Sequence, residues 1–378
     1  MRTSKRPRAK RGGNIALLSL FLLVIMLSVV ALAVDIGYFQ VASTELQRSA
    51  DSAAIAATWK LLDEMGPNAS VTPATLSAVR STASQYAGFN QVASAAPNLA
   101  EGDVQIGHLA YPFSSAAGLT FGDPDQFNAV AVSVRRTADN NGELPTFFAK
   151  VMGRMGVAAE AQATAAFVNN VAGFRPPATG ENLDILPFTL DEDTWNNRTS
   201  GDDLYHYDPD SGQVTAGSDG IPEVDLYPHG TGPPGNRGTL DIGSPNNSTA
   251  DICRQIRYGI TAEDLSYIDG EIRFDPETVT LSLNGDTGIS AGVKDDLASV
   301  IGQPRVIPIF RTVSGPGNNA TYTIVRFVGV RVMYVKLTGS LSQKKVLVQP
   351  APIIIPGVIP GNDTPTSDYV YSPVWLVR

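Results

Sequence analysis

The stretch Ile15–Val34, IALLSLFLLVIMLSVVALAV, decides how the rest of this chain is organised. It has twenty residues, no charged side chain, and only Ser19 and Ser28 as polar positions. A helix rises about 1.5 Å per residue, so a stretch of this length extends over roughly 30 Å, the thickness of the hydrocarbon core of a bilayer. The sequence therefore predicts a transmembrane helix at residues 14–34.

The charges on the two sides of this stretch differ. Six cations precede it, and the next Lys or Arg after it is Arg48. The six are Arg2, Lys5, Arg6, Arg8, Lys10 and Arg11. Because positive residues stay on the cytoplasmic side of a membrane, residues 1–13 are expected to be a cytoplasmic basic tail. The chain after Asp35 is then expected to be exported, as in a single-pass membrane protein.

A cleaved signal peptide is the alternative to a retained anchor. Ala31-Leu32-Ala33 fits an A-x-A cleavage site, but the apolar stretch is longer than the roughly 7–15 residues that signal peptides use. The helix is also predicted to continue through residues 35–65. Tyr38–Met65 contains neither Pro nor Gly, and Gly66-Pro67 then supplies residues that end helices.

This extension is predicted to be an amphipathic helix with a seam made mostly of Ala. Positions at alternating spacings of three and four form the heptad-like seam. They are Phe39, Ala42, Leu46, Ala50, Ala53, Ala57 and Lys60. Ala lets another backbone approach closely, so the seam packs either on the chain's own globular part or on partner helices.

Three segments around the helix carry a resemblance to a known family. They are Arg11–Ala16 (RGGNIA), Ala33–Tyr38 (AVDIGY) and Glu45–Ala54 (ELQRSADSAA), with the apolar stretch between the first two. Together they resemble the N-terminal segment of TadE/TadG-like proteins of the tight-adherence (Flp, type IVb) pilus assembly system. The resemblance implies a structural component of pilus assembly in the cell envelope, anchored in the bacterial inner membrane with its exported region in the periplasm.

The similarity continues toward the C-terminus. Three further segments resemble the Tad-like region that adjoins this N-terminal segment in the family: Asn128–Arg136, Phe147–Gly153 and Val157–Ala166. Gly235–Ile242 (GNRGTLDI) is similar to a GNxGxLDL segment that follows it in many such proteins. Pseudopilin relatives are cleaved before the apolar run and have Glu five positions after the cut. A cut after Gly13 would place Leu18 there, so we expect an unprocessed anchor.

The fold class expected for the whole chain is α+β. Residues 66–172 are predicted to form a small α+β domain. Its helices are expected at 73–88 and 144–155, and its strands at 103–111, 128–136 and 157–168. Residues 173–250 begin with the linker-like Gly173–Gly180 and continue as an acidic, loop-rich segment.

Residues 251–378 are expected to form a β-rich C-terminal domain. Candidate strands lie at 278–283, 305–310, 321–338, 344–349 and 369–377. In the longest, the alternation of apolar residues changes phase across Gly329, which predicts a bulge or bend there.

Charge and cysteine content exclude several classes of function. The net charge is −9, and it is −15 without the six cations of the tail, so nucleic-acid binding by the exterior is not expected. Cys253 is the only cysteine, which excludes an internal disulfide and a Cys-based metal cluster. The chain contains no phosphate-binding loop motif and no dinucleotide fingerprint, so no cofactor and no small-molecule substrate are expected.

One hydrolase-like motif is present and is better explained as a turn. Gly288–Gly292 (GISAG) matches G-x-S-x-G, in which Ser290 would be the nucleophile. That arrangement needs a His later in the chain, whereas His108, His206 and His229 all precede it. The three histidines also lack the spacing of a zinc motif. The chain is therefore not expected to be an enzyme.

The acidic segment offers weak calcium candidates. Two carboxylates stand at i and i+2, as in calcium loops, and others follow within a few residues. The candidates are Asp208, Asp210, Asp219 and Asp225. The ligand order of an EF-hand is missing, so a solvated acidic loop is the preferred interpretation and no metal site is assigned.

The interpretation favoured by the sequence is a membrane-anchored structural or scaffolding component resembling TadG-like proteins of Flp pilus assembly. Its partners would be the membrane and, through the N-terminal helix, pilus-assembly or envelope proteins. The residues predicted to make these contacts are Asp35, Ala42, Leu46, Ala50, Ala53 and Ala57. The alternative is an anchored envelope binding or adhesion module with no connection to a pilus.

Overall fold

The computed structural model describes residues 15–68, 70–111, 113, 118–227, 237–243, 248–315, 317–361 and 364–377. The predicted basic tail, His229 and part of the GNRGTLDI segment lie outside these residues. Contacts divide the chain into two units. The first contains residues 1–53, 84–104 and 132–163, and the second contains residues 54–83, 105–131 and 164–378.

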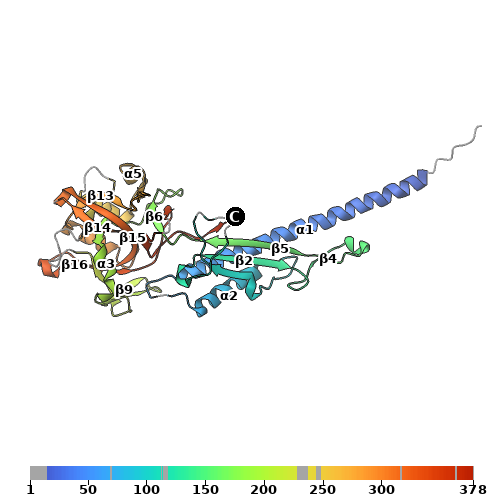
Figure 1. The fold of residues 1–378 in the computed structure, drawn as a ribbon, viewed down its shortest axis with the longest axis horizontal. Helices are drawn as coiled ribbons and strands as arrows, with labels where there is room; N and C mark the ends of the chain where they lie inside the picture. The colour runs from blue at the N-terminus through green and yellow to red at the C-terminus, as the bar shows by residue number, and fades with distance from the viewer. Residues whose placement is uncertain are drawn as a thin grey trace, which may run out of the picture. The chain divides into compact units, whose positions relative to one another are not determined.

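Helix α1 (Ile15–Asp63) is unbroken over 49 residues, as the absence of Pro and the wealth of Leu and Ala predict (Figure 1). It ends just before Gly66-Pro67, where the sequence indicates a stop. Helix α2 (Pro73–Phe89) confirms the second predicted helix. Pro73 occupies its first position, where a missing N–H costs nothing, and the Thr72 hydroxyl accepts a hydrogen bond from the Thr75 N–H at 3.2 Å.

Four strands form the first sheet, in the order β1-β2-β5-β21. Their bounds are β1 Val104–Gly107, β2 Ala129–Arg136, β5 Ala159–Ala166 and β21 Trp375–Val377. The first three lie within the predicted strand regions. The predicted strand at 369–377 is split, because only β20 (Val370–Tyr371) and β21 are extended and paired, with Pro373 between them. β21 pairs antiparallel with β5, with Trp375 opposite Ala166.

The predicted helix at 144–155 is wrong. Strand β3 (Leu144–Pro145) pairs antiparallel with β4 (Gly156–Val157), so the segment between them closes as a hairpin. Only one 3-10 turn, η3 (Ala149–Met152), forms inside it. Gly153 adopts φ 86° directly after this turn, a left-handed conformation that ends a helix. The apolar residues that suggested a helix face are those of an exposed loop.

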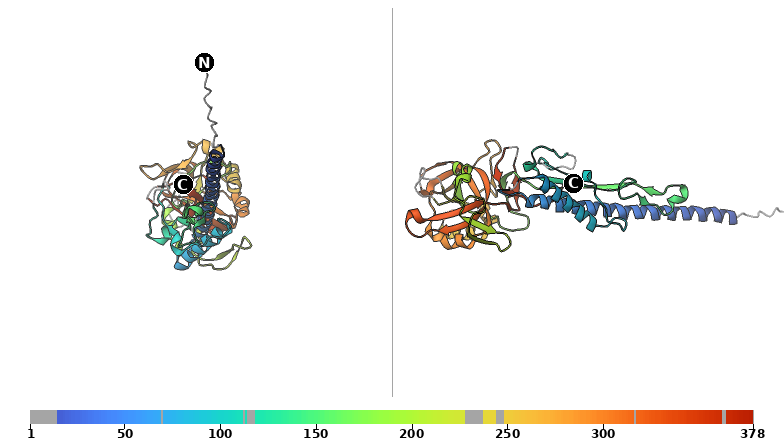
Figure 2. Two further views of the ribbon diagram at one scale, coloured as in Figure 1. Left: turned by 90° about the vertical axis from the view of Figure 1, so that its right-hand side faces the viewer. Right: turned by 90° about the horizontal axis from the view of Figure 1, so that it is seen from below.

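The C-terminal region is β-rich, as predicted (Figure 2), and the strand pairings show that its main sheet closes on itself. The strands pair in the order β15-β13-β11-β7-β14, and β14 pairs again with β15, which completes a five-stranded ring. Strands β16, β10 and β19 extend the sheet outside this ring. The bounds are β7 Phe188–Asp191, β10 Val224–Asp225, β11 Arg237–Leu240, β13 Leu281–Asp286, β14 Pro304–Ser314, β15 Ala320–Lys336, β16 Lys345–Pro350 and β19 Ser367–Asp368.

Smaller sheets and short helices surround this ring. β6 (Val171–Phe174) lies between β12 (Ile272–Arg273) and β18 (Val358–Pro360), β17 (Ile353–Ile354) pairs with β20, and β8 (Tyr205–Asp208) pairs with β9 (Gln213–Ala216). The α-helices described in residues 164–378 are α3 Glu192–Asn196, α4 Thr249–Tyr258, α5 Ala262–Ser266 and α6 Lys294–Ser299.

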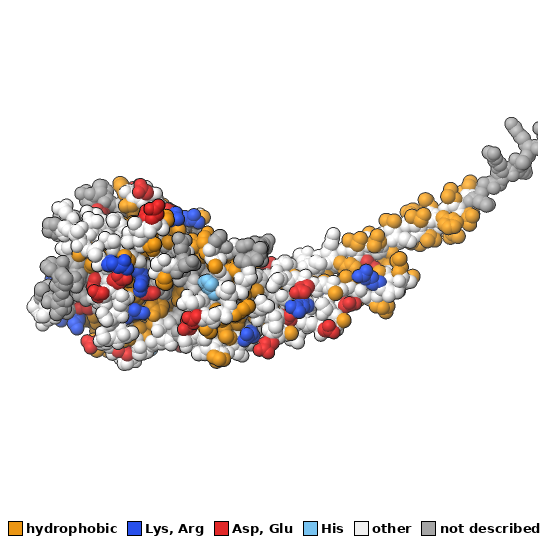
Figure 3. Space-filling model, in the orientation of Figure 1, with side chains coloured by type: hydrophobic (Ala, Val, Ile, Leu, Met, Phe, Trp, Pro, Cys, Tyr) orange, Lys and Arg blue, Asp and Glu red, His pale blue; other side chains and the backbone are white. Residues whose placement is uncertain are grey.

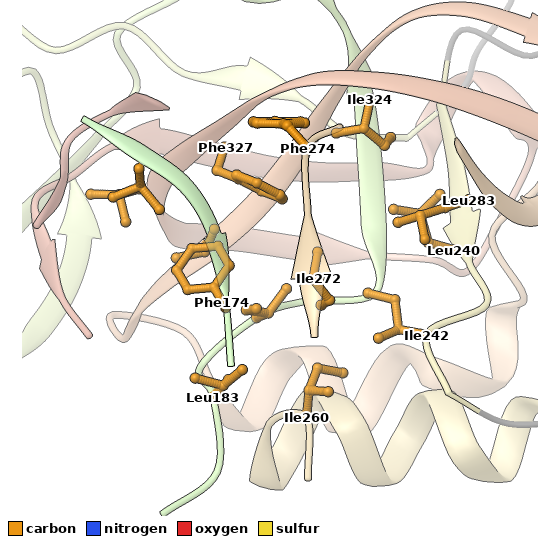
Figure 4. Packing of buried hydrophobic residues seen from close by; sticks show 14 of the residues in the cluster. Phe174, Leu183, Leu240, Ile242, Ile260, Ile272, Phe274, Leu283, Ile324 and Phe327 are labelled. Carbon is orange, nitrogen blue, oxygen red and sulfur yellow. The ribbon is translucent and has the colours of Figure 1, made fainter. Parts of the chain in front are cut away.

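Aromatic rings from separate segments meet in the core of this region (Figure 4). The ring of Phe327 on β15 lies 4.7 Å from that of Phe274 and 5.0 Å from that of Phe174 on β6. Phe327 and its neighbour Val328 are both fully buried, in two separate apolar clusters. Because successive strand residues point to opposite faces, β15 has a packed core on each side.

The predicted bulge at Gly329 is wrong in position. Gly329 pairs regularly with Val306, and the irregularities lie four residues to either side, at Val325 opposite β14 and at Met333 opposite β16. Gly329 is needed for a different reason. A Cβ atom there would lie 2.4 Å from the carbonyl oxygens of Ala351 and Tyr369. The strand approaches two other backbones too closely for any side chain.

Gly329→Ala is therefore expected to destabilise the chain by about 1–3 kcal/mol, since Ala351 directly follows β16 and Tyr369 lies between β19 and β20, so neither carbonyl can move without shifting the strands next to it. The measurement is denaturant unfolding followed by tryptophan fluorescence, to which the fully buried Trp195 contributes. Gly288→Ala is the matched control, because a Cβ at that position meets nothing within 4 Å. Equal unfolding midpoints for the two variants would contradict the crowding argument.

Candidate functional site

The apolar side chains in the N-terminal part of α1 are exposed and not covered by other described residues, and Figure 3 shows them on the face in view. Fifteen large apolar residues between Ile15 and Val34 are each at least 46% exposed. Burying one such side chain stabilises a protein by roughly 1.5–3 kcal/mol, so exposing all of them to water forgoes tens of kcal/mol. Within the part of the chain that the structure describes, this is the one helix that is long and apolar enough to cross a membrane.

The apolar part ends at Asp35, whose carboxylate is bound by backbone N–H groups of the β3–β4 hairpin. Oδ1 accepts from Phe147 at 2.8 Å, and Oδ2 accepts from Phe148 at 3.1 Å and from Ala149 at 2.9 Å. The side chain is only 4% exposed. Tyr38, one turn further along α1, adds an edge-to-face contact with the ring of Phe147 at 5.0 Å. Asp35 thus fixes the hairpin to the exact turn of α1 at which the apolar stretch ends.

These contacts set the charge state of Asp35. Desolvation by burial raises its pKa, but the N–H groups of Ala149, Phe147 and Phe148 together outweigh this, and Lys150 adds a favourable charge. The pKa of Asp35 is therefore held below its ordinary value. The carboxylate stays ionised at neutral pH and provides the negative charge that the N-terminus of η3 favours.

The Ala seam is buried within the chain itself. Ala42, Ala50, Ala53 and Ala57 are fully buried, and Leu46 is nearly so. In the first unit, the Ser49 hydroxyl donates to the Ala87 carbonyl of α2 at 3.1 Å, and the Ala93 N–H donates to the Glu45 carboxylate at 2.7 Å. In the second, the Thr58 hydroxyl lies 3.3 Å from the carbonyl of Ala165 on β5. These contacts are intramolecular, and they leave little of the seam exposed to a partner.

The acidic candidates do not converge on one point. Asp208 accepts from the Asp210 N–H and the Ser211 hydroxyl, while the side chain of Asp210 is exposed. Asp219 accepts from the Ile221 N–H and the amide of Gln349. Asp225 accepts from the Tyr227 and Val346 N–H groups. Among the described residues, no group of three or more His, Cys, Asp or Glu side chains is placed to hold a metal.

The acidic segment instead contains a buried polar network that sequence reasoning missed. The Glu223 carboxylate accepts from the N–H groups of Leu204 and Tyr205 at 2.7 and 3.1 Å, and the Gln349 amide of β16 lies 3.0 Å from it. Burial raises the pKa of Glu223, against the effect of these donors. The network ties the β8–β9 hairpin to the main sheet. In the sequence, Glu223 resembles the other acidic residues of this segment. Only the structure shows that it is buried.

Ser290 has a structural role in this fold. Its exposed hydroxyl accepts from the Gly292 N–H at 3.2 Å and caps the short turn η5 (Ala291–Val293). In the second unit a cleft of about 560 Å³ contains His108 and Asp125. There His108 Nδ1 lies 3.0 Å from the Gln126 carbonyl, and Asp125 accepts from the Val71 N–H at 2.9 Å. Both groups hold backbone in place, and neither activates the other.

Asp35→Ala is expected to loosen the β3–β4 hairpin, because it removes the acceptors of three N–H groups. Hydrogen exchange should become severalfold faster at Phe147, Phe148 and Ala149, while α1 remains helical. The full chain in detergent can be measured by exchange with mass spectrometry. Asp63→Ala, at an exposed acid on the same helix, is the control. Unchanged exchange in Asp35→Ala would show that the hairpin is held by other contacts.

The same interaction has a defined pH dependence. A carboxyl group with a lowered pKa in the folded state stabilises that state fully above its unfolded-state pKa, which is near 3.8. The contribution is lost as pH falls through the lower folded value. The difference in melting temperature between the wild type and Asp35→Asn should therefore be constant from neutral pH to about 4 and should shrink below it.

Two family models match this chain and confirm the resemblance seen in its N-terminal segments. Residues 13–65 match "Putative Flp pilus-assembly TadE/G-like", and residues 56–165 match "Putative Tad-like Flp pilus-assembly". No curated protein and no solved structure matches the chain. The matched residues contain the apolar helix, Asp35, the Ala seam and the β3–β4 hairpin. Residues 13–165 of the chain are therefore similar to two families of Flp pilus-assembly proteins, TadE/G-like at 13–65 and Tad-like at 56–165.

Proposed function

We propose that the chain is a single-pass membrane protein that serves as a structural or scaffolding component of Flp (type IVb) pilus assembly. The observation that supports this most directly is the exposed apolar part of α1, which lies within the residues that match the TadE/G-like family. We propose a non-catalytic role, because the side chains of Ser290, His108 and Asp125 make hydrogen bonds with backbone groups of the fold.

The proposed orientation places the N-terminus in the cytoplasm. Six cations precede the apolar stretch, and no Lys or Arg follows it before Arg48. Residues 1–13 would form the cytoplasmic tail and residues 14–34 the span in the inner membrane. The extended helix at 35–65 would then present the Tad-like domain (66–172), the acidic segment (173–250) and the β-rich domain (251–378) to the periplasm.

Retention of the anchor is supported by the continuity of α1. The helix passes through Ala31-Leu32-Ala33 without a break and continues to Asp63. Two residues beyond that tripeptide, the Asp35 carboxylate accepts hydrogen bonds from the β3–β4 hairpin. Release from the membrane would thus cut the chain next to a buried contact. We propose that the seam and Asp35 contribute to partner binding by holding the exported helix and hairpin in a fixed shape.

Charging the apolar stretch tests the anchor. Leu23→Arg combined with Met26→Arg should raise the free energy of membrane insertion by roughly 5–7 kcal/mol, at about 2.5–3.5 kcal/mol per Arg. The chain should then shift from the membrane fraction to the soluble fraction. Val41→Arg with Thr44→Arg is the control, because both positions are exposed on the same helix outside the apolar stretch. A wild-type chain that is soluble and begins after Ala33 would contradict a retained anchor.

The assembly role is tested by capturing partners in cells. After cross-linking in a piliated host, the full chain should co-purify with the assembly ATPase and platform proteins of the pilus machinery. The Leu23→Arg/Met26→Arg variant should lose them, since it is no longer held at the same membrane. Recovery of a glycan or protein ligand without any pilus component would support an anchored binding or adhesion module instead.

A further inference from the structure

The β3–β4 hairpin exposes an apolar surface that none of the described residues covers. Its loop, residues 147–155, reads FFAKVMGRM. Val151 and Met152 are each 89% exposed and Met155 is 72% exposed, while Phe147 and Phe148 are about half exposed. Monomeric soluble proteins seldom gather so many large apolar side chains at one loop tip. The composition therefore points to a surface that is covered in the cell.

The position of this loop indicates what covers it. Asp35 binds the N–H groups of residues 147–149, which places the loop at the end of the apolar stretch. Ala31, one turn inside that stretch, is half-buried, whereas the preceding apolar residues are exposed. Figures 1 and 2 both show the hairpin beside α1, with its tip directed toward the N-terminal end of the helix. The loop thus lies level with the boundary of the proposed membrane span.

The charges of the loop match a lipid surface. Its only charged residues are Lys150 and Arg154, both exposed. They alternate with Val151, Met152 and Met155, so cations and apolar side chains share the same tip. Long basic side chains can extend to phosphate groups while their neighbours enter the acyl region. Lipid surrounds a membrane span, so a loop at the boundary of the span lies next to headgroups and acyl chains.

We propose that residues 147–155 form a second membrane contact, in which Val151, Met152 and Met155 insert into the outer-face leaflet beside α1 and Lys150 and Arg154 bind anionic headgroups. The inference rests on the proposed anchoring of α1. With two contacts joined at Asp35, the exported helix cannot rotate freely about its own axis. The first unit is then held at a defined rotation about α1 and at a defined height above the membrane.

Depth-dependent fluorescence quenching tests this contact in the full chain. Cys253→Ser supplies a background without thiols, because Cys253 is the only cysteine. Single cysteines are introduced by Met152→Cys at the loop tip, Leu20→Cys in the apolar stretch and Phe89→Cys as an exposed apolar control on α2. Each labelled protein is reconstituted in nanodiscs of phosphatidylcholine and phosphatidylglycerol containing brominated acyl chains.

The labels at Met152 and Leu20 should both be quenched severalfold more than the label at Phe89. Quenching at Leu20 together with a Met152 label that matches Phe89 would overturn the loop contact and leave the anchor intact. An unquenched Leu20 label would overturn both. A Met152 label that is protected from brominated lipid and also from aqueous iodide would show that protein covers the loop, which again overturns the lipid contact.

A second variant separates charge from the apolar insertion. In Lys150→Gln/Arg154→Gln, quenching at Met152 should fall, and it should become equal in nanodiscs with and without phosphatidylglycerol. The control is Arg48→Gln, which removes an exposed cation further along α1. Wild-type quenching that does not depend on phosphatidylglycerol would contradict the assigned role of the two cations.

Discussion

Helix α1 combines two kinds of surface on one unbroken run of backbone hydrogen bonds. A chain that crosses a bilayer must pair every backbone group internally, and a helix does so without any neighbour. From Ile15 to Val34, apolar side chains lie on every side of the helix, which suits the hydrocarbon that would surround a membrane span. From Ala42 onward the apolar positions narrow to a stripe of Ala that packs on the chain's own elements. The rest of the N-terminal part is built along this helix.

The change from the exposed apolar stretch to the packed part of α1 begins at Asp35. A carboxylate that donates nothing must find donors when it is buried, and the β3–β4 hairpin supplies three backbone N–H groups. The hairpin in turn cannot be helical, because Gly153 and the pairing of Leu144 with Val157 close it into a loop. One acid therefore couples the end of the apolar stretch to the loop that exposes Phe, Val and Met beside it. Both elements lie within the residues that the family models match.

The C-terminal region depends on a different constraint, close approach of strands. Five strands close into a ring, and β15 carries buried side chains on both faces. Gly329 is buried where two other backbones meet the strand, and bulges at Val325 and Met333 restore the alternation on either side. The acidic segment is joined to this sheet through Glu223 and Gln349. Several of its carboxylates, among them Glu223, Asp219 and Asp225, accept hydrogen bonds from backbone N–H groups.

How far the sequence predicts this protein depends on how local each signal is. The apolar stretch, the helix to Asp63, helix α2 and the long strand β15 follow from composition and period alone, because each depends on residues that are neighbours in the sequence. Asp35 could be recognised as unusual at the end of the apolar stretch. Its partners could not, because they lie more than a hundred residues away and offer only their backbone.

Residues 147–155 show the limit most clearly. Their apolar spacing resembles a helix face, and the sequence alone favours that interpretation. Strand pairing at both ends, and the N–H groups taken by Asp35, decide for an exposed hairpin instead. The sequence by itself determined the apolar helix, the α+β class and the family resemblance of residues 13–165, because these are local patterns. Only the tertiary structure decided that the Ala seam is internal, that Gly329 marks a crossing of backbones and that an apolar loop stands beside Asp35. Each of these depends on contacts between distant segments, whose geometry no local pattern specifies.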